Sequence, residues 1–170
     1  MTPPPPDGRP AVLAGQVREA LDADSWATIA LIGACWAEYP GCVMAVEREC
    51  PELLAPASYY RSLGGQFWVV PEGGWVAACV GFRPISAKSV ELVKLYVAPH
   101  RRGRGLGRSL AGLVEQHAWS KAAIGIELWS DSRFTTAHRL YTALGYQADG
   151  RTRQLHDLSE TTELHFHKPL

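Results

Sequence analysis

The sequence predicts a single α/β domain built around a mixed β-sheet. Apolar and polar residues alternate over 89–97, fall at helical spacing from Leu106 to about Ser120, and alternate again over 124–129. A strand, a helix and a second strand in this order favour parallel pairing through a right-handed crossover. Upstream, the turn residues 71–74 join two apolar runs and indicate an antiparallel hairpin. The length of 170 residues is typical of one domain with a sizeable core.

The other elements follow from their caps and stops. Asp24 or Ser25 can cap a helix that Pro40 and Gly41 end, and Gly145 gives the last helix a left-handed stop. The expected strands are 12–18, 66–70, 75–82, 89–97, 124–129, 146–149 and 162–167. The expected helices are 24–36, 58–63, 106–120 and 133–144. Residues 40–57 are expected to form a loop with room for a short helical turn, because they hold four prolines and glycines and no clear period.

Composition and charge exclude several classes of protein. Lys and Arg number 17, as do Asp and Glu, so no global field favours nucleic acid or an anionic membrane. No apolar run of about 18 residues predicts a membrane span. Residues 1–10 are proline-rich and lack the regions of a signal peptide, so we expect a disordered lead-in to a cytoplasmic domain over 11–170. The four cysteines form no Cys-x-x-Cys pair and are expected to be reduced thiols. The sequence is compatible with both a monomer and a homodimer.

A turn rich in glycine and arginine joins the strand 89–97 to the following helix. Gly103, Gly105 and Gly107 alternate there with basic residues, and glycine lets backbone N–H groups face a ligand. The start of the helix adds a positive dipole end, and the arginines add forked donors. The turn predicts a site for a phosphorylated ligand, above all a pyrophosphate, whereas the alternative is a basic surface loop. A P-loop lysine is absent, and the last two glycines are too close together for a dinucleotide fingerprint.

Two motifs in this half of the chain have the order and separation of a known family. Residues 102–107 read Arg-Gly-Arg-Gly-Leu-Gly after the strand 91–97, and residues 137–146 read Ala-His-Arg-Leu-Tyr-Thr-Ala-Leu-Gly-Tyr. Together they resemble the Arg/Gln-x-x-Gly-x-Gly/Ala motif, the central strand and the second signature of the GNAT superfamily of acyl-CoA-dependent N-acyltransferases. The similarity covers about 66–150. It implies a mixed, mostly antiparallel sheet with helices on both faces, acetyl-CoA as co-substrate without a metal, and a small-molecule or peptide amine as acceptor.

The resemblance assigns the coenzyme to this turn and to the strand before it. The backbone of Leu95, Tyr96 and Val97 would bind the pantetheine amides and polarise the thioester oxygen. The family often has Asn seven positions before its catalytic tyrosine, where this chain has Phe134, and a nearby polar residue is expected to take over that pantetheine contact. The candidates for that contact are Ser130, Ser132 and Arg133. The residues expected at the pyrophosphate are Arg102, Gly103, Arg104, Gly105, Leu106, Gly107 and Arg108.

Two residues are candidates for proton transfer. Tyr141 occupies the tyrosine position of the second signature and is expected to protonate the departing thiolate, the alternative being a core tyrosine. Glu91 is the candidate general base, because burial on a strand face can tune a carboxyl for that work. A regular strand would place Glu91 on one face with Val93, Leu95 and Val97. Glu91 could instead anchor the acceptor amine or be solvated, with a water chain serving as the base.

The histidines and the N-terminal loop have plainer interpretations. His156, His165 and His167 are interpreted as a solvated strand face and not as a metal cluster, because the spacing supplies no third ligand beside the last two. The loop 39–57, together with Tyr59 and Tyr60, is expected by analogy with the family to line the acceptor pocket.

Two other functions stay open at this point. A non-catalytic acyl-CoA-binding module would bind the coenzyme without turnover, and the presence of Tyr141 argues against it. A nucleic-acid-binding protein that uses the cluster from Arg101 to Arg108 would bind in a steeply salt-dependent way, and the neutral net charge argues against it.

Overall fold

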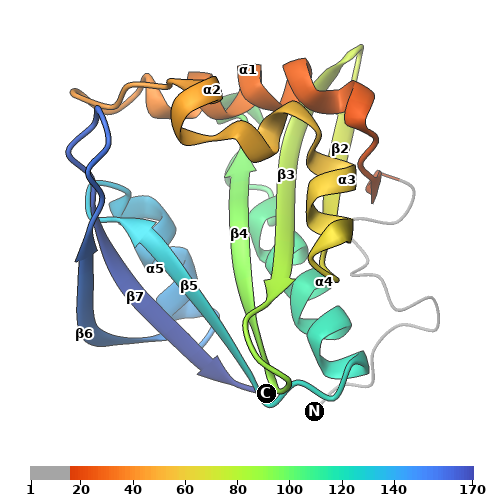
Figure 1. The fold of residues 1–170 in the computed structure, drawn as a ribbon, viewed down its shortest axis with the longest axis vertical. Coiled ribbons are helices and arrows are strands. Elements are labelled where there is room, and N and C mark those ends of the chain that lie inside the picture. Colours follow the sequence, from red (N-terminus) through yellow and green to blue (C-terminus); the bar gives the residue numbers. More distant parts are fainter. Residues whose placement is uncertain (1–15) are drawn as a thin grey trace.

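The computed structural model describes residues 16–170, whose strands form one sheet in the order β1-β2-β3-β4-β5-β7-β6 (Figure 1). The predictions for residues 1–10, for the domain start at residue 11 and for strand residues 12–15 lie outside the described residues. The strands are β1 (Arg18–Glu19), β2 (Gln66–Glu72), β3 (Trp75–Pro84), β4 (Ser89–Val97), β5 (Gly125–Asp131), β6 (Gln147–Gln154) and β7 (Thr162–Pro169). The helices are α1 (Ser25–Trp36), α2 (Val46–Glu49), α3 (Pro56–Ser62), α4 (Leu106–Ser120) and α5 (Thr135–Ala143), with 3-10 turns η2 (Asp22–Asp24), η3 (Pro51–Leu54) and η4 (Pro99–Arg101).

The topology agrees with the fold class that the sequence predicts. Neighbouring strands of the described sheet pair antiparallel, except for β4 and β5, which are parallel and joined through α4. The mixed α+β sheet with one parallel crossover is therefore confirmed. The loop 40–57 contains two short helical segments, α2 and η3, where one short turn is expected. One strand differs from expectation, because β6 continues to Gln154. Every side chain of β6 is exposed, so no apolar alternation marks that strand in the sequence.

Strands β4 and β5 pair only at their first residues and then separate. Ser89, Val90 and Glu91 pair with 125–127, whereas the rest of both strands has no mutual pairing. Figure 1 shows the two strands close together near the C-terminus and diverging toward the opposite end of the sheet. This divergence leaves one edge of β4 without β5 as a pairing partner over its C-terminal half.

A β-bulge in β4 corrects the predicted strand face. Cys79 pairs with Tyr96 and Gly81 with Val93, so two residues of β4 lie opposite one residue of β3. Lys94 takes the extra position with a φ of 53°. A regular strand would put Glu91, Val93, Leu95 and Val97 on one face, and that prediction is wrong. Leu95 and Val97 pack with Val90 and Leu92 toward α4, whereas Val93 packs on the α1 face.

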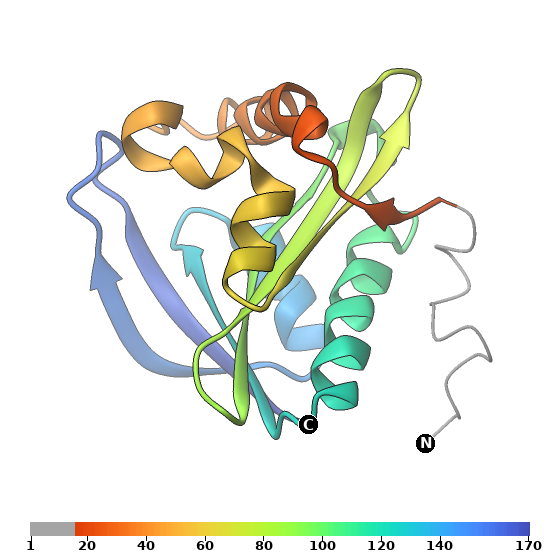
Figure 2. The same ribbon diagram turned by 45° about the vertical axis from the view of Figure 1, so that its right-hand side comes forward.

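Helices cover both faces of the sheet, as the resemblance implies. Apolar residues of α4 and α5 bury one face in a core that includes Leu110, Val114 and Tyr141. The other face is covered by α1, η3 and α3 through residues such as Ile32 and Leu53. Figure 2 shows α4 and α3 on opposite sides of β2 and β3. Within residues 16–170, no helix combines the length and the apolar character needed to cross a bilayer.

Candidate active site

Two cavities meet where β4 and β5 diverge. The first, which we call the loop cavity, has a volume of about 390 Å³ and is bounded by the 102–108 turn, the end of β4 and α5. The second, which we call the sheet cavity, has a volume of about 330 Å³ and lies over the β4–β5 opening, among α1, η3, α3 and the loop 155–161. The residues that line both cavities are Leu95, Tyr96, Phe134, Ala137 and Tyr141. A ligand in one cavity can therefore reach a ligand in the other at these residues.

The loop cavity contains the expected features of an anion site. Gly105 is the N-terminal flanking residue of α4 with a φ of 78°, and Gly103 has a φ of 73°. These left-handed conformations favour glycine, and a Cβ added at either residue would meet no atom within 4 Å. No side chain caps the N-terminus of α4, so its first backbone N–H groups stay available to a ligand. Gly107 serves packing instead, since an added Cβ would lie 3.2 Å from Leu140.

The arginines of the turn divide into two kinds. The Arg102 guanidinium forms two hydrogen bonds to Glu38, at 2.7 and 2.8 Å, and its Nε donates to the Val97 carbonyl at 2.9 Å. Arg102 therefore fastens the turn to the end of α1, and phosphate binding by its side chain stays a prediction. Within residues 16–170, the exposed side chains of Arg104 and Arg108 have no ion-pair partner closer than 4.0 Å. Arg108 lines the loop cavity, and Arg104 does not.

Strand β4 supplies the wall between the turn and α5. Leu95, Tyr96 and Val97 all line the loop cavity, in agreement with their predicted position. The Tyr96 hydroxyl accepts a 2.8 Å hydrogen bond from Trp36 Nε1, which holds its ring against α1. Because β5 has diverged at this level, the backbone of these residues faces the cavity on one edge.

Tyr141 lies at the junction of the two cavities. Its ring is buried in the α4–α5 core against Tyr146 and Phe166, with centroid distances of 5.9 and 5.7 Å. Burial raises the pKa of Tyr141 above its ordinary value, so the phenol stays protonated throughout the neutral range. Its hydroxyl has no hydrogen-bond partner in the described part of the chain. A protonated phenol with a free O–H at this junction is suited to donating a proton to a bound ligand.

Phe134, at the start of α5, lines both cavities. Its ring lies 4.7 Å from that of Tyr39 and 6.5 Å from that of Tyr96. Among the described residues, Ser130, Ser132 and Arg133 do not line the loop cavity, so the structure does not support them as replacements for the pantetheine contact. Thr136 does line it, and sequence reasoning missed this residue because no motif marks it.

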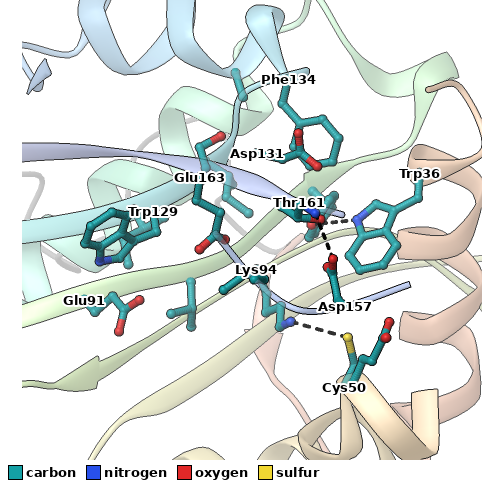
Figure 3. A pocket seen from close by; sticks show the side chains of 18 of the residues that line it. Trp36, Cys50, Glu91, Lys94, Trp129, Asp131, Phe134, Asp157, Thr161 and Glu163 are labelled. Carbon is teal, nitrogen blue, oxygen red and sulfur yellow. Dashed lines mark hydrogen bonds between the residues drawn. The ribbon is translucent and has the colours of Figure 1, made fainter. Parts of the chain in front are cut away.

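The sheet cavity is lined by charged and aromatic side chains (Figure 3). Glu91 and Trp129 lie toward one end of the view, and Trp36 and Asp157 toward the other. Tyr59 and Tyr60 also line the cavity, and their role in an acceptor pocket stays a prediction. The acidic lining residues are Glu49, Glu52, Glu91, Asp131, Asp157 and Glu163, and the basic ones are Arg83, Lys94 and Arg153.

The three basic residues are each paired with a carboxylate of the same lining. Arg83 contacts Glu91 at 2.6 Å, and Lys94 contacts Glu52 at 2.8 Å. The bulge in β4 directs Lys94 into the cavity, where coulombic attraction from Glu52 helps to raise its pKa despite the opposing cost of burial. Glu91 does reach the cavity, although its carboxylate is already engaged by Arg83. Sequence reasoning missed Arg83, because its role depends on strand pairing.

The histidine prediction needs a correction. His165 is fully buried and not part of a solvated face, because Glu127, Asp149 and Arg151 surround its ring. The group that it forms includes Asp149 and His167 but not His156, which lies exposed in the loop after β6.

The chain matches known proteins in both sequence and fold. The acetyltransferase (GNAT) family model matches residues 30–146, and the chain therefore belongs to this family. Rat N-acetyltransferase 8 is 29% identical over 120 residues, which are 66% of this chain and 54% of that protein. The chain thus spans about half the length of that curated relative.

Solved structures support the same fold. An acetyltransferase of Streptococcus agalactiae has a TM-score of 0.77 at 20% identity and aligns over 91% of this chain and 98% of its own. The PaiA N-acetyltransferase of Thermoplasma acidophilum, solved in complex with coenzyme A, has a TM-score of 0.72 at 17% identity and aligns over 91% and 98%.

Proposed function

We propose that this chain transfers an acetyl group from acetyl-CoA to a primary amine by direct attack. The observation that carries the proposal is the meeting of the loop cavity and the sheet cavity at Tyr141. The uncapped start of α4 and the exposed Arg108 support pyrophosphate binding in the loop cavity. The family and the coenzyme held by one fold neighbour support acetyl-CoA as the donor.

The reaction forms a C–N bond and breaks a C–S bond. It also removes a proton from the attacking nitrogen and delivers one to the leaving sulfur. The amine nitrogen attacks the thioester carbon, and backbone N–H groups of β4 at 95–97 stabilise the developing oxyanion. The C–S bond then breaks, and Tyr141 donates its phenolic proton to the thiolate. An acceptor that enters as an ammonium loses one proton before the attack and a second from the tetrahedral intermediate, both by way of the sheet cavity. One of these protons returns through water to the Tyr141 phenolate, so that the products are an amide, CoA and one released proton.

Two candidates for the base that takes the amine proton are Glu91 and water. Glu91 lines the sheet cavity, which favours the base role. Its ion pair with Arg83 equally favours a positioning role, with water carrying the proton. Replacement of Glu91 by Gln distinguishes these roles, because loss of a base removes its titration from the acid limb of the pH profile, whereas loss of a positioning group lowers the rate and keeps the shape of the profile.

The charge of the sheet cavity favours a cationic acceptor. Six carboxylates face three basic side chains there, and Glu49 and Asp157 have no ion-pair partner within 4.0 Å among the described residues. A protonated amine is attracted to such a lining, and Trp36 adds an aromatic face that suits a cation. The Trp129 ring already holds the Arg153 guanidinium, 4.4 Å from its centroid. A small-molecule or peptide amine fits this requirement. Nucleic acid does not, since Arg101 and Arg102 are paired with Glu72 and Glu38. The four free cysteines support a reducing, cytoplasmic location.

The decisive experiment is an acceptor screen. The protein is incubated with acetyl-CoA and matched amines of positive, neutral and negative charge, while CoA thiol and acetylated product are measured. We expect turnover with cationic amines and little with anionic ones. Coenzyme binding without turnover on any amine would overturn the enzymatic proposal and leave an acyl-CoA-binding module. Salt-sensitive binding to DNA or RNA would support the nucleic-acid alternative.

A further inference from the structure

Asp149, His165 and His167 bring three metal-ligand groups together on the sheet formed by β5, β7 and β6. Their ligand atoms all lie within 4.8 Å of one another. Asp149 Oδ2 is 2.9 Å from His165 Nδ1 and 4.0 Å from His167 Nδ1. A bulge in β6 creates this arrangement, because residues 149–151 all lie opposite His165 in the pairing with β7.

His165 has more acceptors around it than it can satisfy as a neutral ring. Its Nε2 lies 2.9 Å from Glu127 Oε2, and its Nδ1 lies 2.9 Å from Asp149 Oδ2. A neutral imidazole has one N–H, so a donor at Nε2 leaves the Nδ1 lone pair facing a carboxylate oxygen. A cation at this point satisfies both atoms: in the structure the Arg151 guanidinium supplies it, 2.9 Å from Nδ1, and a metal ion could take its place. The Glu127–His165 contact then has the form of the carboxylate–histidine–metal relay, in which a carboxylate orients the ligating ring.

His167 gives an independent indication of a ligand site. Its Nδ1 atom is buried and has no hydrogen-bond partner in the described part of the chain. The rings of His165 and His167 are stacked with a centroid distance of 6.2 Å, so both Nδ1 atoms face the Asp149 carboxylate. A buried nitrogen without a partner is destabilising unless a ligand accepts its lone pair.

The side chain of Arg151 provides the positive charge at this position. Its Nε donates to Asp149 Oδ2 at 2.7 Å, and one terminal nitrogen lies 2.9 Å from His165 Nδ1. The side chain is 57% exposed, so it can move into solvent without disturbing the core. The guanidinium therefore stands where a bound cation would lie, and any metal ion must compete with it.

We propose that Asp149, His165 and His167 bind one divalent transition-metal ion of the kind that prefers imidazole, with Zn²⁺ as the first candidate, after Arg151 swings out. Two nitrogens and one carboxylate oxygen are a donor set typical of Zn²⁺, whereas Mg²⁺ and Ca²⁺ prefer oxygen ligands. The site is separate from the acyl-transfer machinery. Trp129, which lines the sheet cavity, packs against the site, with its ring 4.7 Å from that of His165.

The test is a zinc titration of the untagged, chelator-treated chain by calorimetry and by competition with a chromophoric chelator. We expect one Zn²⁺ per chain and no comparable binding of Mg²⁺ or Ca²⁺. His167→Ala should weaken binding at least tenfold, and Glu127→Gln should weaken it roughly 10–100-fold through the loss of ring orientation. Arg151→Ala should tighten binding, because it removes the competing cation. His156→Ala is the matched control, since this histidine lies outside the cluster and should leave affinity unchanged.

Each other outcome contradicts the proposal. Zinc binding that survives His167→Ala would place the ion on other groups, such as the cysteine thiols. Absence of binding in the wild-type chain, or binding confined to Arg151→Ala, would mean that the guanidinium fills the site permanently. Because His167 is half-exposed, its replacement should preserve the fold, and circular dichroism and the melting temperature check this for every variant.

Discussion

At the scale of single residues, the environment of Tyr141 combines two properties that acyl transfer needs. Its ring is fixed by packing in the core, and its hydroxyl faces the junction of two cavities. The pKa rise caused by burial keeps the phenol protonated, so its O–H is available as a hydrogen-bond donor to a bound ligand. Tyr146, five residues after Tyr141, packs in the same core but lines neither cavity.

Replacement of Tyr141 by Phe tests this assignment. The loss of one hydroxyl should lower kcat roughly 10²–10⁴-fold and leave KM for acetyl-CoA nearly unchanged, because the contact matters only as the thiolate leaves. Steady-state kinetics on an acceptor for which chemistry limits the rate give the answer. Tyr146→Phe removes a neighbouring hydroxyl and should leave kcat unchanged. Full activity of Tyr141→Phe would leave protonation of the thiolate to water.

At the scale of elements, glycine conformations and ion pairs join the pieces of the site. Left-handed glycines let the turn pass from β4 into α4 without a side chain over the helix start. Arg102 joins this turn to Glu38 at the end of α1, and the hydrogen bonds from Arg102 lower the pKa of the Glu38 carboxyl. A similar link fastens β1 to the start of α1, where Arg18 and Asp24 contact each other at 2.7 Å.

Gly105→Asp tests the turn as a phosphate site. An added Cβ meets no neighbour, so the fold should persist with a strain cost of about 1–2 kcal/mol from the left-handed backbone. A carboxylate at this point should repel a pyrophosphate and largely abolish CoA binding, which calorimetry measures. Gly74→Asp provides the matched control, because Gly74 has a φ of 83° and equally open surroundings at the β2–β3 turn. Equal CoA affinity in the folded Gly105→Asp protein would mean that the phosphates lie elsewhere.

The link between Arg18 and Asp24 makes a prediction about pH. The hydrogen bonds from Arg18 lower the pKa of Asp24, so the ion pair stabilises the fold above the unfolded-state pKa and is lost as the pH falls through the folded-state pKa. Asp24→Asn should cost about 1 kcal/mol of unfolding free energy at pH 7. The difference from wild type should shrink below about pH 4. Urea unfolding at pH 7 and pH 3 measures it, with the exposed Glu19→Gln as control, and a difference that is independent of pH would exclude the ion pair as its source.

At the scale of the whole molecule, the diverging β4 and β5 strands create both cavities and let them meet. Sheet continuity is lost there, and a bound coenzyme would take the place of the missing strand partner along β4. A ligand that bridges β4, the turn and α5 should therefore stabilise the entire domain and not one segment of it.

Thermal denaturation with nucleotides measures this effect. At a concentration of 100 times its Kd, acetyl-CoA should add about 2.7 kcal/mol of stability, which corresponds to a rise in Tm of roughly 5–10 °C for a domain of this size. ATP and NAD at the same concentration should do much less, because they lack pantetheine to occupy the β4 edge. Equal shifts from all three compounds would indicate a general anion site.

The sequence by itself determined the local structure and the family. Periodicity marked the hairpin, β4, α4 and β5, and the glycines of the 102–108 turn marked the passage into α4, since both depend on backbone preferences within a few residues. The paired motifs indicated the family that the comparison then confirmed.

Only the tertiary structure decided which side chains meet. The bulge at Lys94 reversed the face of Leu95 and Val97, and the bulge in β6 brought Asp149 to His165. The partners of Arg102 and Glu91 likewise come from helix and strand packing. The physical reason is that one inserted residue shifts strand register and turns the following side chains to the other face, and no pattern in a single segment encodes where its partner segment will lie.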